Sequence, residues 1–138
     1  MNAASAQGAN FIGDQALAGG LLNDAGQVNE FGRAFAHAVV GCAAGAAGAS
    51  APGSATGGAS GCGAGALGAV VGELSAQLYG SANPSKTMAF ASMMGGIAAA
   101  AAGLDAQAVA IAASTGANAA QNNYLTHAQE AQRGARLC

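Results

Sequence analysis

The sequence predicts an all-α protein in which two Ala/Gly-rich helical hairpins pack as a small bundle, with flexible N- and C-terminal flanks. Alanine and glycine make up close to half of the 138 residues, and there is no Trp. Apolar residues recur at three- and four-residue steps between clear turn signals, which is the helical period. Large apolar side chains, whose burial contributes about 25 cal/mol per Å², are scarce. We therefore expect stability to come from close backbone approach and many small contacts.

Charged residues are few, with four basic and six acidic side chains and a net charge of −2. No basic patch could release counterions from a nucleic acid, so nucleic-acid binding is not expected. A polybasic membrane anchor is absent as well. The first 20 residues lack Lys, Arg and a sustained apolar core, so they do not form a signal peptide. Export would then depend on a larger parent chain.

The chain divides into an N-terminal flank (1–27), a helical domain (28–125) and a polar C-terminal tail (126–138). The flank is expected to be partly helical, with a turn at 24–26. The first helix is predicted over 28–48, followed by a loop over 50–61 around Pro52. We expect its buried stripe to consist of larger apolar residues and alanines: Phe31, Ala34, Phe35, Ala38, Val39 and Cys42.

The second helix is predicted over 62–79, with Glu73 and Gln77 on its solvent side. Its apolar face is expected to comprise Leu67, Val70, Val71, Leu74 and Leu78. The third helix is predicted over 86–102, with Ser85 as a candidate cap and Gly103 as its stop. Asp105 should cap a fourth helix over 106–122.

Glycine recurs along helical faces, although glycine in a helix costs about 1 kcal/mol relative to alanine. We infer that this cost is offset by helix packing, because two helix backbones can approach closely where their glycines meet. The candidate helix-packing positions are Gly41, Gly45, Gly65, Gly68 and Gly72.

Residues 34–72 carry no charge and are long enough to span a bilayer of roughly 30 Å. Leu, Ile, Phe and Val, which drive insertion, are few in them, and no aromatic belt is visible. A soluble or marginally amphiphilic bundle is the favoured prediction. A hairpin that enters a membrane on delivery is the alternative.

No catalytic set, metal site or cofactor motif is assembled in the sequence. His37 has Arg33 one turn earlier and no carboxylate at helical spacing, which predicts a partly buried or interfacial histidine. Glu73 and Glu130 are isolated carboxylates expected at solvated or ion-paired surface positions, and His127 lies in the tail. Residues 63–68 match G-x-G-x-x-G but lack the preceding strand and the later acidic residue of a dinucleotide site.

Three cysteines fit no zinc spacing. Cys42 and Cys62 are either small buried apolar residues or a disulfide in an oxidising compartment. Cys138, at the terminus, is expected to be a free thiol.

Four segments together resemble a known family: residues 33–47, 62–73, 103–110 and 117–125. Their order and spacing resemble the pretoxin domain with a VENN motif, found near the C-terminus of the large hemagglutinin-like effectors of contact-dependent growth inhibition. The resemblance covers about residues 30–125. The motif reads Ala120-Gln121-Asn122-Asn123 here, so the Val-Glu pair is replaced and both asparagines are retained.

The resemblance implies a non-catalytic module involved in export or delivery of a C-terminal toxin. Its partner would be the larger toxin polypeptide or the toxin domain, with transient membrane contact. It would be secreted or at the cell surface, or reach the target-cell envelope, as part of that toxin. In such a family Cys42 and Cys62 would meet an oxidising space, where an antiparallel hairpin could place them opposite each other.

Two alternatives remain from other classes of protein. The first is a small pore-forming or bacteriocin-like helical protein. The second is a generic self-association module, a homo-oligomer in which glycine faces pack between chains.

Overall fold

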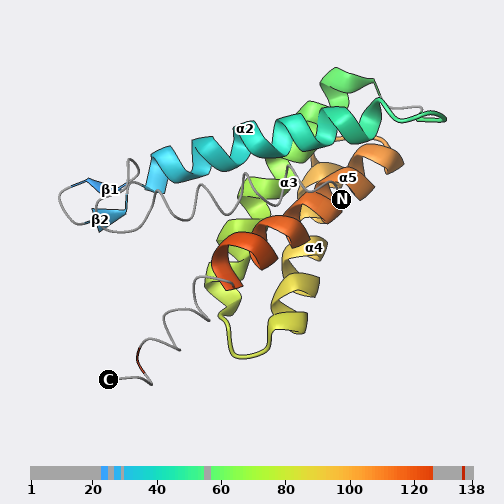
Figure 1. Cartoon of the computed structure of the whole chain (residues 1–138). Coiled ribbons are helices and arrows are strands. Elements are labelled where there is room, and N and C mark those ends of the chain that lie inside the picture. Colours follow the sequence, from blue (N-terminus) through green and yellow to red (C-terminus); the bar gives the residue numbers. More distant parts are fainter. Residues whose placement is uncertain (1–22, 25–26, 29, 55–56, 126–134, 136–138) are drawn as a thin grey trace.

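The computed structural model describes residues 23–24, 27–28, 30–54, 57–125 and 135 of the chain. Within them lie four α-helices, α2 (Glu30–Ala49), α3 (Gly58–Tyr79), α4 (Pro84–Ala101) and α5 (Ala106–Ala119), and a π-helix, η1 (Ala120–Leu125). Figure 1 shows α2 lying across a group formed by α3, α4 and α5. The predicted all-α bundle is therefore confirmed.

A short antiparallel ladder precedes the helices. Strand β1 (Asn23–Asp24) pairs with β2 (Gln27–Val28), with Asp24 opposite Gln27. The prediction that the first helix starts at Val28 was wrong, because Val28 lies in β2 and α2 begins at Glu30. Most of the flank that we expect to be partly helical lies outside the described residues. The predicted turn includes positions 25–26, which lie outside the described residues.

Helix α3 begins at Gly58, four residues before the predicted start at Cys62. The first helical hydrogen bond runs from the Gly61 N–H to the Gly57 carbonyl, at 2.9 Å. No side chain caps this end. Helix propensity alone disfavours a start among Gly and Ser. Gly61 packs directly on Gly45 of α2, and we attribute the extra turn to this tertiary contact.

Helix α4 begins at Pro84, a residue suited to the first helical position because it needs no N–H partner there. Its cap is Asn83, whose Oδ1 accepts a hydrogen bond from the Lys86 N–H at 3.2 Å. The prediction that Ser85 is the cap was wrong, because Ser85 already lies within the helix.

The turn between α4 and α5 follows the prediction closely. Gly103 has a φ of +76°, the left-handed conformation that glycine adopts at helix C-termini. The Leu104 N–H donates to the Ala99 carbonyl at 3.1 Å, which closes the last turn of α4. Asp105 then caps α5, its Oδ1 accepting from the Ala108 N–H at 2.9 Å.

Helices α3, α4 and α5 share a core built from one small residue per helix in successive layers. Ala64, Ala99 and Ala108 form one layer, and all three are fully buried. The next layer joins Gly68, Gly95 and Ala112, and the one after it joins Gly72, Ala91 and Gly116. Each step along a helix is four residues, so α3 and α5 run parallel and α4 runs antiparallel to both.

Several large apolar side chains lie on the outside, in contrast to the predicted buried stripes, although Leu67, Leu104, Val109 and Ile111 are partly buried against the core. On α2, Phe35 is 64% exposed and Val39 54%. On α3, Leu78 is 87% exposed. Leu74 on α3, Tyr79 at its end, and Met93 and Ile97 on α4 are exposed as well. The reason is geometric: where the backbones approach most closely, they leave room only for Gly and Ala.

Candidate functional site

The α2–α3 interface is the site where the candidate residues gather. Its centre is a glycine seam formed by Gly41 and Gly45 of α2 and Gly61 and Gly65 of α3. A Cβ built on any of the four would lie closer than 3.0 Å to atoms of the opposite helix, carbonyl oxygens among them. Any side chain at these positions would force the helices apart, so the close contact requires glycine.

The seam has a regular antiparallel register. Gly41 faces Gly65 and, four residues on, Gly45 faces Gly61. Continued toward the N-terminus of α2, the same four-residue steps bring Arg33 opposite Glu73, and they form an ion pair. The contact face of α2 is therefore a stripe of Arg33, His37, Gly41 and Gly45, adjacent to the stripe that hydrophobicity predicted.

The other two predicted packing glycines contact α5 and not α2. Gly68 and Gly72 pack on α5, against Ala112 and Gly116 respectively. From three- and four-residue spacing alone, Gly61, Gly65, Gly68 and Gly72 fall along one side of this helix. That face is in fact divided between α2 and α5.

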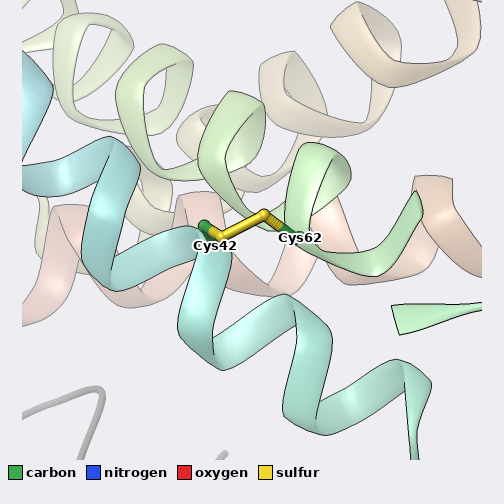
Figure 2. The surroundings of a disulfide bond; sticks show 2 residues. All are labelled: Cys42 and Cys62. Carbon is green, nitrogen blue, oxygen red and sulfur yellow. A yellow bond between two sulfur atoms is a disulfide. The ribbon is translucent and has the colours of Figure 1, made fainter. Parts of the chain in front are cut away.

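Cys42 and Cys62 form a disulfide between α2 and α3 (Figure 2). Their Cα atoms are 3.8 Å apart. Each cysteine directly follows a seam glycine, Gly41 in one case and Gly61 in the other. The covalent link therefore lies beside the point where the two backbones are closest. Cys138 lies outside the described residues.

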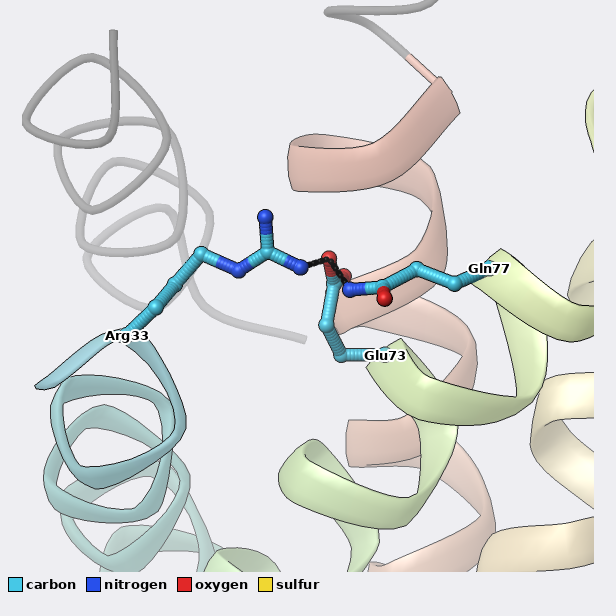
Figure 3. Close-up of polar contacts among 3 residues, drawn as sticks. All are labelled: Arg33, Glu73 and Gln77. Atoms are coloured by element: carbon cyan, nitrogen blue, oxygen red, sulfur yellow. Dashed lines mark hydrogen bonds and ion pairs between the residues drawn. The ribbon is translucent and has the colours of Figure 1, made fainter. Parts of the chain in front are cut away.

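Beyond the seam, a polar cluster joins the two helices. Arg33 Nη2 lies 3.1 Å from Glu73 Oε1, and Gln77 Nε2 donates to the same oxygen at 3.2 Å. Figure 3 shows Arg33 reaching from α2 to the carboxylate on α3. The Glu73 side chain is only 5% exposed. The prediction that Glu73 lies on the solvent side was wrong, because packing of α2 covers it. Glu130, the other isolated carboxylate of the sequence analysis, lies outside the described residues.

His37 is buried between this cluster and the seam, with 1% of the residue exposed. It is therefore interfacial, as predicted, but more deeply buried than expected. Burial, and then the nearby charge of Arg33, lower its pKa from 6.5 to about 4. The imidazole is consequently neutral at physiological pH. Its Nε2 has no hydrogen-bond partner among the described residues.

Two small cavities flank His37. One, of about 50 Å³, is an open cleft between α2 and α3 lined by Arg33, Glu73 and Gln77 as well as His37. The other, of about 10 Å³, lies toward α5 and includes Thr115 and Asn118 in its lining. Sequence reasoning missed this contact with α5, since no spacing rule relates residue 37 to residues 115–118.

The motif residues lie where α5 changes into the π-helix η1. The predicted helix over 106–122 is therefore α-helical only to Ala119. Ala120 is fully buried and Gln121 is exposed. Asn122 Nδ2 donates to the Asn118 side chain at 2.6 Å and to its carbonyl at 3.1 Å. For Asn123 the structure describes only the backbone. π-Helical turns are rare and are found frequently at functional sites.

Within the described part of the chain, no group of three or more His, Cys, Asp or Glu side chains could hold a metal ion. No helix in that part is both long and apolar enough to cross a membrane. His127 falls outside it.

The fold and this site define a disulfide-linked all-α bundle whose helices pack through small residues. No family model, no curated protein and no solved structure matches the chain.

Proposed function

We propose that the chain is a non-catalytic pretoxin module that takes part in export or delivery of a toxin as a segment of a larger polypeptide. The proposal rests on the four segments that resemble pretoxin domains. It places the chain outside the cytoplasm of the producing cell, at the cell surface or in transit. The partner is the polypeptide that carries the toxin.

One observation carries the proposal. The four segments that resemble pretoxin domains contain residues of the glycine seam, the disulfide, the interhelical ion pair and the α4–α5 turn. Residues 33–47 supply Arg33, His37, Gly41, Cys42 and Gly45. Residues 62–73 supply their partners Cys62, Gly65 and Glu73. The third segment opens with Gly103 and Asp105 at the α4–α5 turn, and the fourth includes the Asn118–Asn122 contact. The four segments thus coincide with the helices and turns that make these contacts, which is what supports the proposal.

The disulfide agrees with an oxidising environment, because such bonds persist outside the cytoplasm and are rare within it. The described side chains offer His37 and Glu73 as titratable groups at the site. One is a buried neutral imidazole and the other is engaged with Arg33 and Gln77. The two cavities described beside them, of about 50 Å³ and about 10 Å³, are smaller than the roughly 300 Å³ that a metabolite needs.

A chimeric effector tests the proposal. Residues 28–125 would replace the pretoxin segment of a contact-dependent growth inhibition protein, with its adhesin and toxin left intact. We expect killing of susceptible target cells in co-culture, whereas an effector lacking the segment should not kill. A matched chimera carrying Gly65→Val, which disrupts the seam, should lose delivery, while Gly63→Val should retain it. A chimera no better than the deletion would rule out the proposed function.

The outward position of Phe35, Val39, Leu74 and Leu78 favours one second candidate, a small membrane-active protein. Apolar side chains on the surface could contact lipid without a spanning helix. Dye release from neutral and anionic vesicles at micromolar protein tests it, and no release would exclude it. Self-association through glycine faces has less support, because these faces are already packed within the chain.

A further inference from the structure

We propose that the cleft between α2 and α3 is a binding site for ordered water, in which one water molecule links the imidazole of His37 to the carboxylate of Glu73. The two helices are then joined by a hydrogen-bonded bridge in addition to the glycine seam and the disulfide. This inference does not depend on the proposed function.

His37 is the residue that requires a hydrogen-bond partner. Only 1% of it is exposed, and its Nε2 has no partner among the described residues. Leaving a buried polar atom unsatisfied is costly, and native structures supply such atoms with a protein group or an ordered water. The residue lines the cleft, so a water molecule there can reach the ring.

Glu73 provides a second polar group at the same cleft. Arg33 and Gln77 both donate to its Oε1, and the other oxygen, Oε2, is buried as well. A carboxylate has about four lone-pair sites, so Glu73 can accept a further hydrogen bond without losing Arg33 or Gln77. A water molecule in the cleft can therefore contact α2 through His37 and α3 through Glu73.

The volume of the cleft suits water. It holds about 50 Å³, and one water molecule needs roughly 10–15 Å³, so the cleft has room for a few molecules. The second cavity beside His37 holds about 10 Å³, at or below the space that a single water needs. The cleft is thus the better site of the two.

The chemistry of the two groups favours water over a cation. Burial and the charge of Arg33 lower the pKa of His37 to about 4, so the imidazole is neutral at physiological pH and carries one N–H and one lone pair. Water can donate to Glu73 and can either donate to Nε2 or accept from it, so it fits both tautomers. A cation could use only the lone pair and would lie beside the positive charge of Arg33.

A high-resolution crystal structure of the intact, disulfide-bonded chain tests the bridge directly. We expect a water oxygen within hydrogen-bond distance of both His37 Nε2 and a carboxylate oxygen of Glu73. Absence of such a water would overturn the proposal. A direct His37–Glu73 hydrogen bond, or a water that joins His37 to Asn118 or Thr115 instead, would overturn it as well.

NMR cross-relaxation between water and the Val70 methyl groups, which line the cleft, tests the site in solution. We expect NOE and ROE signals of opposite sign, as long-lived water gives. Ala34→Leu places a larger apolar side chain at the wall of the cleft and should remove these signals. Ala43→Leu, the same change at an exposed position of α2, should retain them. Equal signals in the two leucine variants, or signals typical of surface water in the unmodified chain, would contradict the proposal.

His37→Phe tests the role of the imidazole, because it keeps a ring and removes both nitrogens. We expect the long-lived water signals at Val70 to be lost. Their persistence would show that His37 does not hold the water, and the proposed bridge would be wrong. Should His37→Phe fail to fold, the crystal structure and the two leucine variants decide.

Discussion

Gly41 of α2 and Gly65 of α3 face each other so closely that neither could carry a Cβ without meeting the other's carbonyl oxygen. The same is true of Gly45 and Gly61 one turn away. The helices are thus in contact through their backbones, and the disulfide lies next to this contact.

Alanine substitutions in α3 should have opposite effects at neighbouring glycines. Gly65→Ala should destabilise the chain by about 1–3 kcal/mol or more, because the methyl group meets the backbone of α2. Gly63→Ala, with nothing within 4 Å of the added carbon, should stabilise it by up to about 1 kcal/mol through helix propensity. Denaturant unfolding measures both. Equal effects of the two substitutions would contradict the seam.

The Cys42–Cys62 bond should contribute about 3 kcal/mol to stability, since it closes a loop with a sequence separation of 20 residues. A reducing agent should therefore lower the Tm of the unmodified chain. The Cys42→Ala/Cys62→Ala double variant should begin at that lower Tm and should not respond to the reductant. A Tm indifferent to reduction in both proteins would argue against the bond.

Removing both partners of the buried ion pair should cost less than the sum of the two separate removals. Glu73→Ala leaves the Arg33 guanidinium, 15% exposed, without this carboxylate and should destabilise by roughly 3 kcal/mol. The Arg33→Met/Glu73→Leu pair should cost less than the sum of the two single changes. A double-mutant cycle of unfolding free energies provides the comparison, and strict additivity would show that the pair is not coupled.

Stability should fall on acidification between about pH 6.5 and pH 4. The pKa of His37 in the folded chain is about 4, against 6.5 for an unperturbed histidine. In that window the unfolded chain binds the proton and the folded chain does not, so lowering the pH favours unfolding. The contribution is fully present above pH 6.5 and is lost toward pH 4, with a size of roughly 3 kcal/mol. In His37→Gln this component of the pH dependence should vanish; an unchanged slope would mean that other groups account for it.

The helix caps offer a local test of the α3–α4 and α4–α5 turns. Asn83→Ala and Asp105→Ala should each cost about 1 kcal/mol, because each removes a side-chain acceptor from a backbone N–H. Ser85→Ala, within the first turn of α4, should change stability by less than about 0.5 kcal/mol. A larger loss at Ser85 than at Asn83 would reverse the assignment of the cap.

Local signals in the sequence were sufficient for the helices and most of their ends. Gly103 and Asp105 mark a stop and a start through backbone conformation and a short-range hydrogen bond, and both were predictable. The early start of α3 at Gly58 was not, because the contact between Gly61 and Gly45 that accompanies it is tertiary.

The sequence predicted several of the residues that belong to the candidate site, but it did not predict which of them are buried or which contact each other. The packing glycines and the cysteine pair could be named from spacing, whereas Glu73 was placed at the surface and Phe35 in the core. Both errors have one cause, since a hydrophobic stripe normally indicates the buried face of a helix. In this chain small size selects the residues at the closest helix contacts, and the buried carboxylate of Glu73 is paired with Arg33 of the neighbouring helix.

The sequence by itself determined that the chain is helical and that its helices must pack through small residues, because these follow from local periodicity and from the scarcity of large side chains. Only the tertiary structure decided which faces meet: Arg33 with Glu73, Gly41 with Gly65, and His37 enclosed by α3 and α5. The register of two helices depends on how their whole surfaces fit together, and the residues that meet are as far as forty positions apart in the sequence. Rules based on short-range sequence spacing cannot predict such contacts.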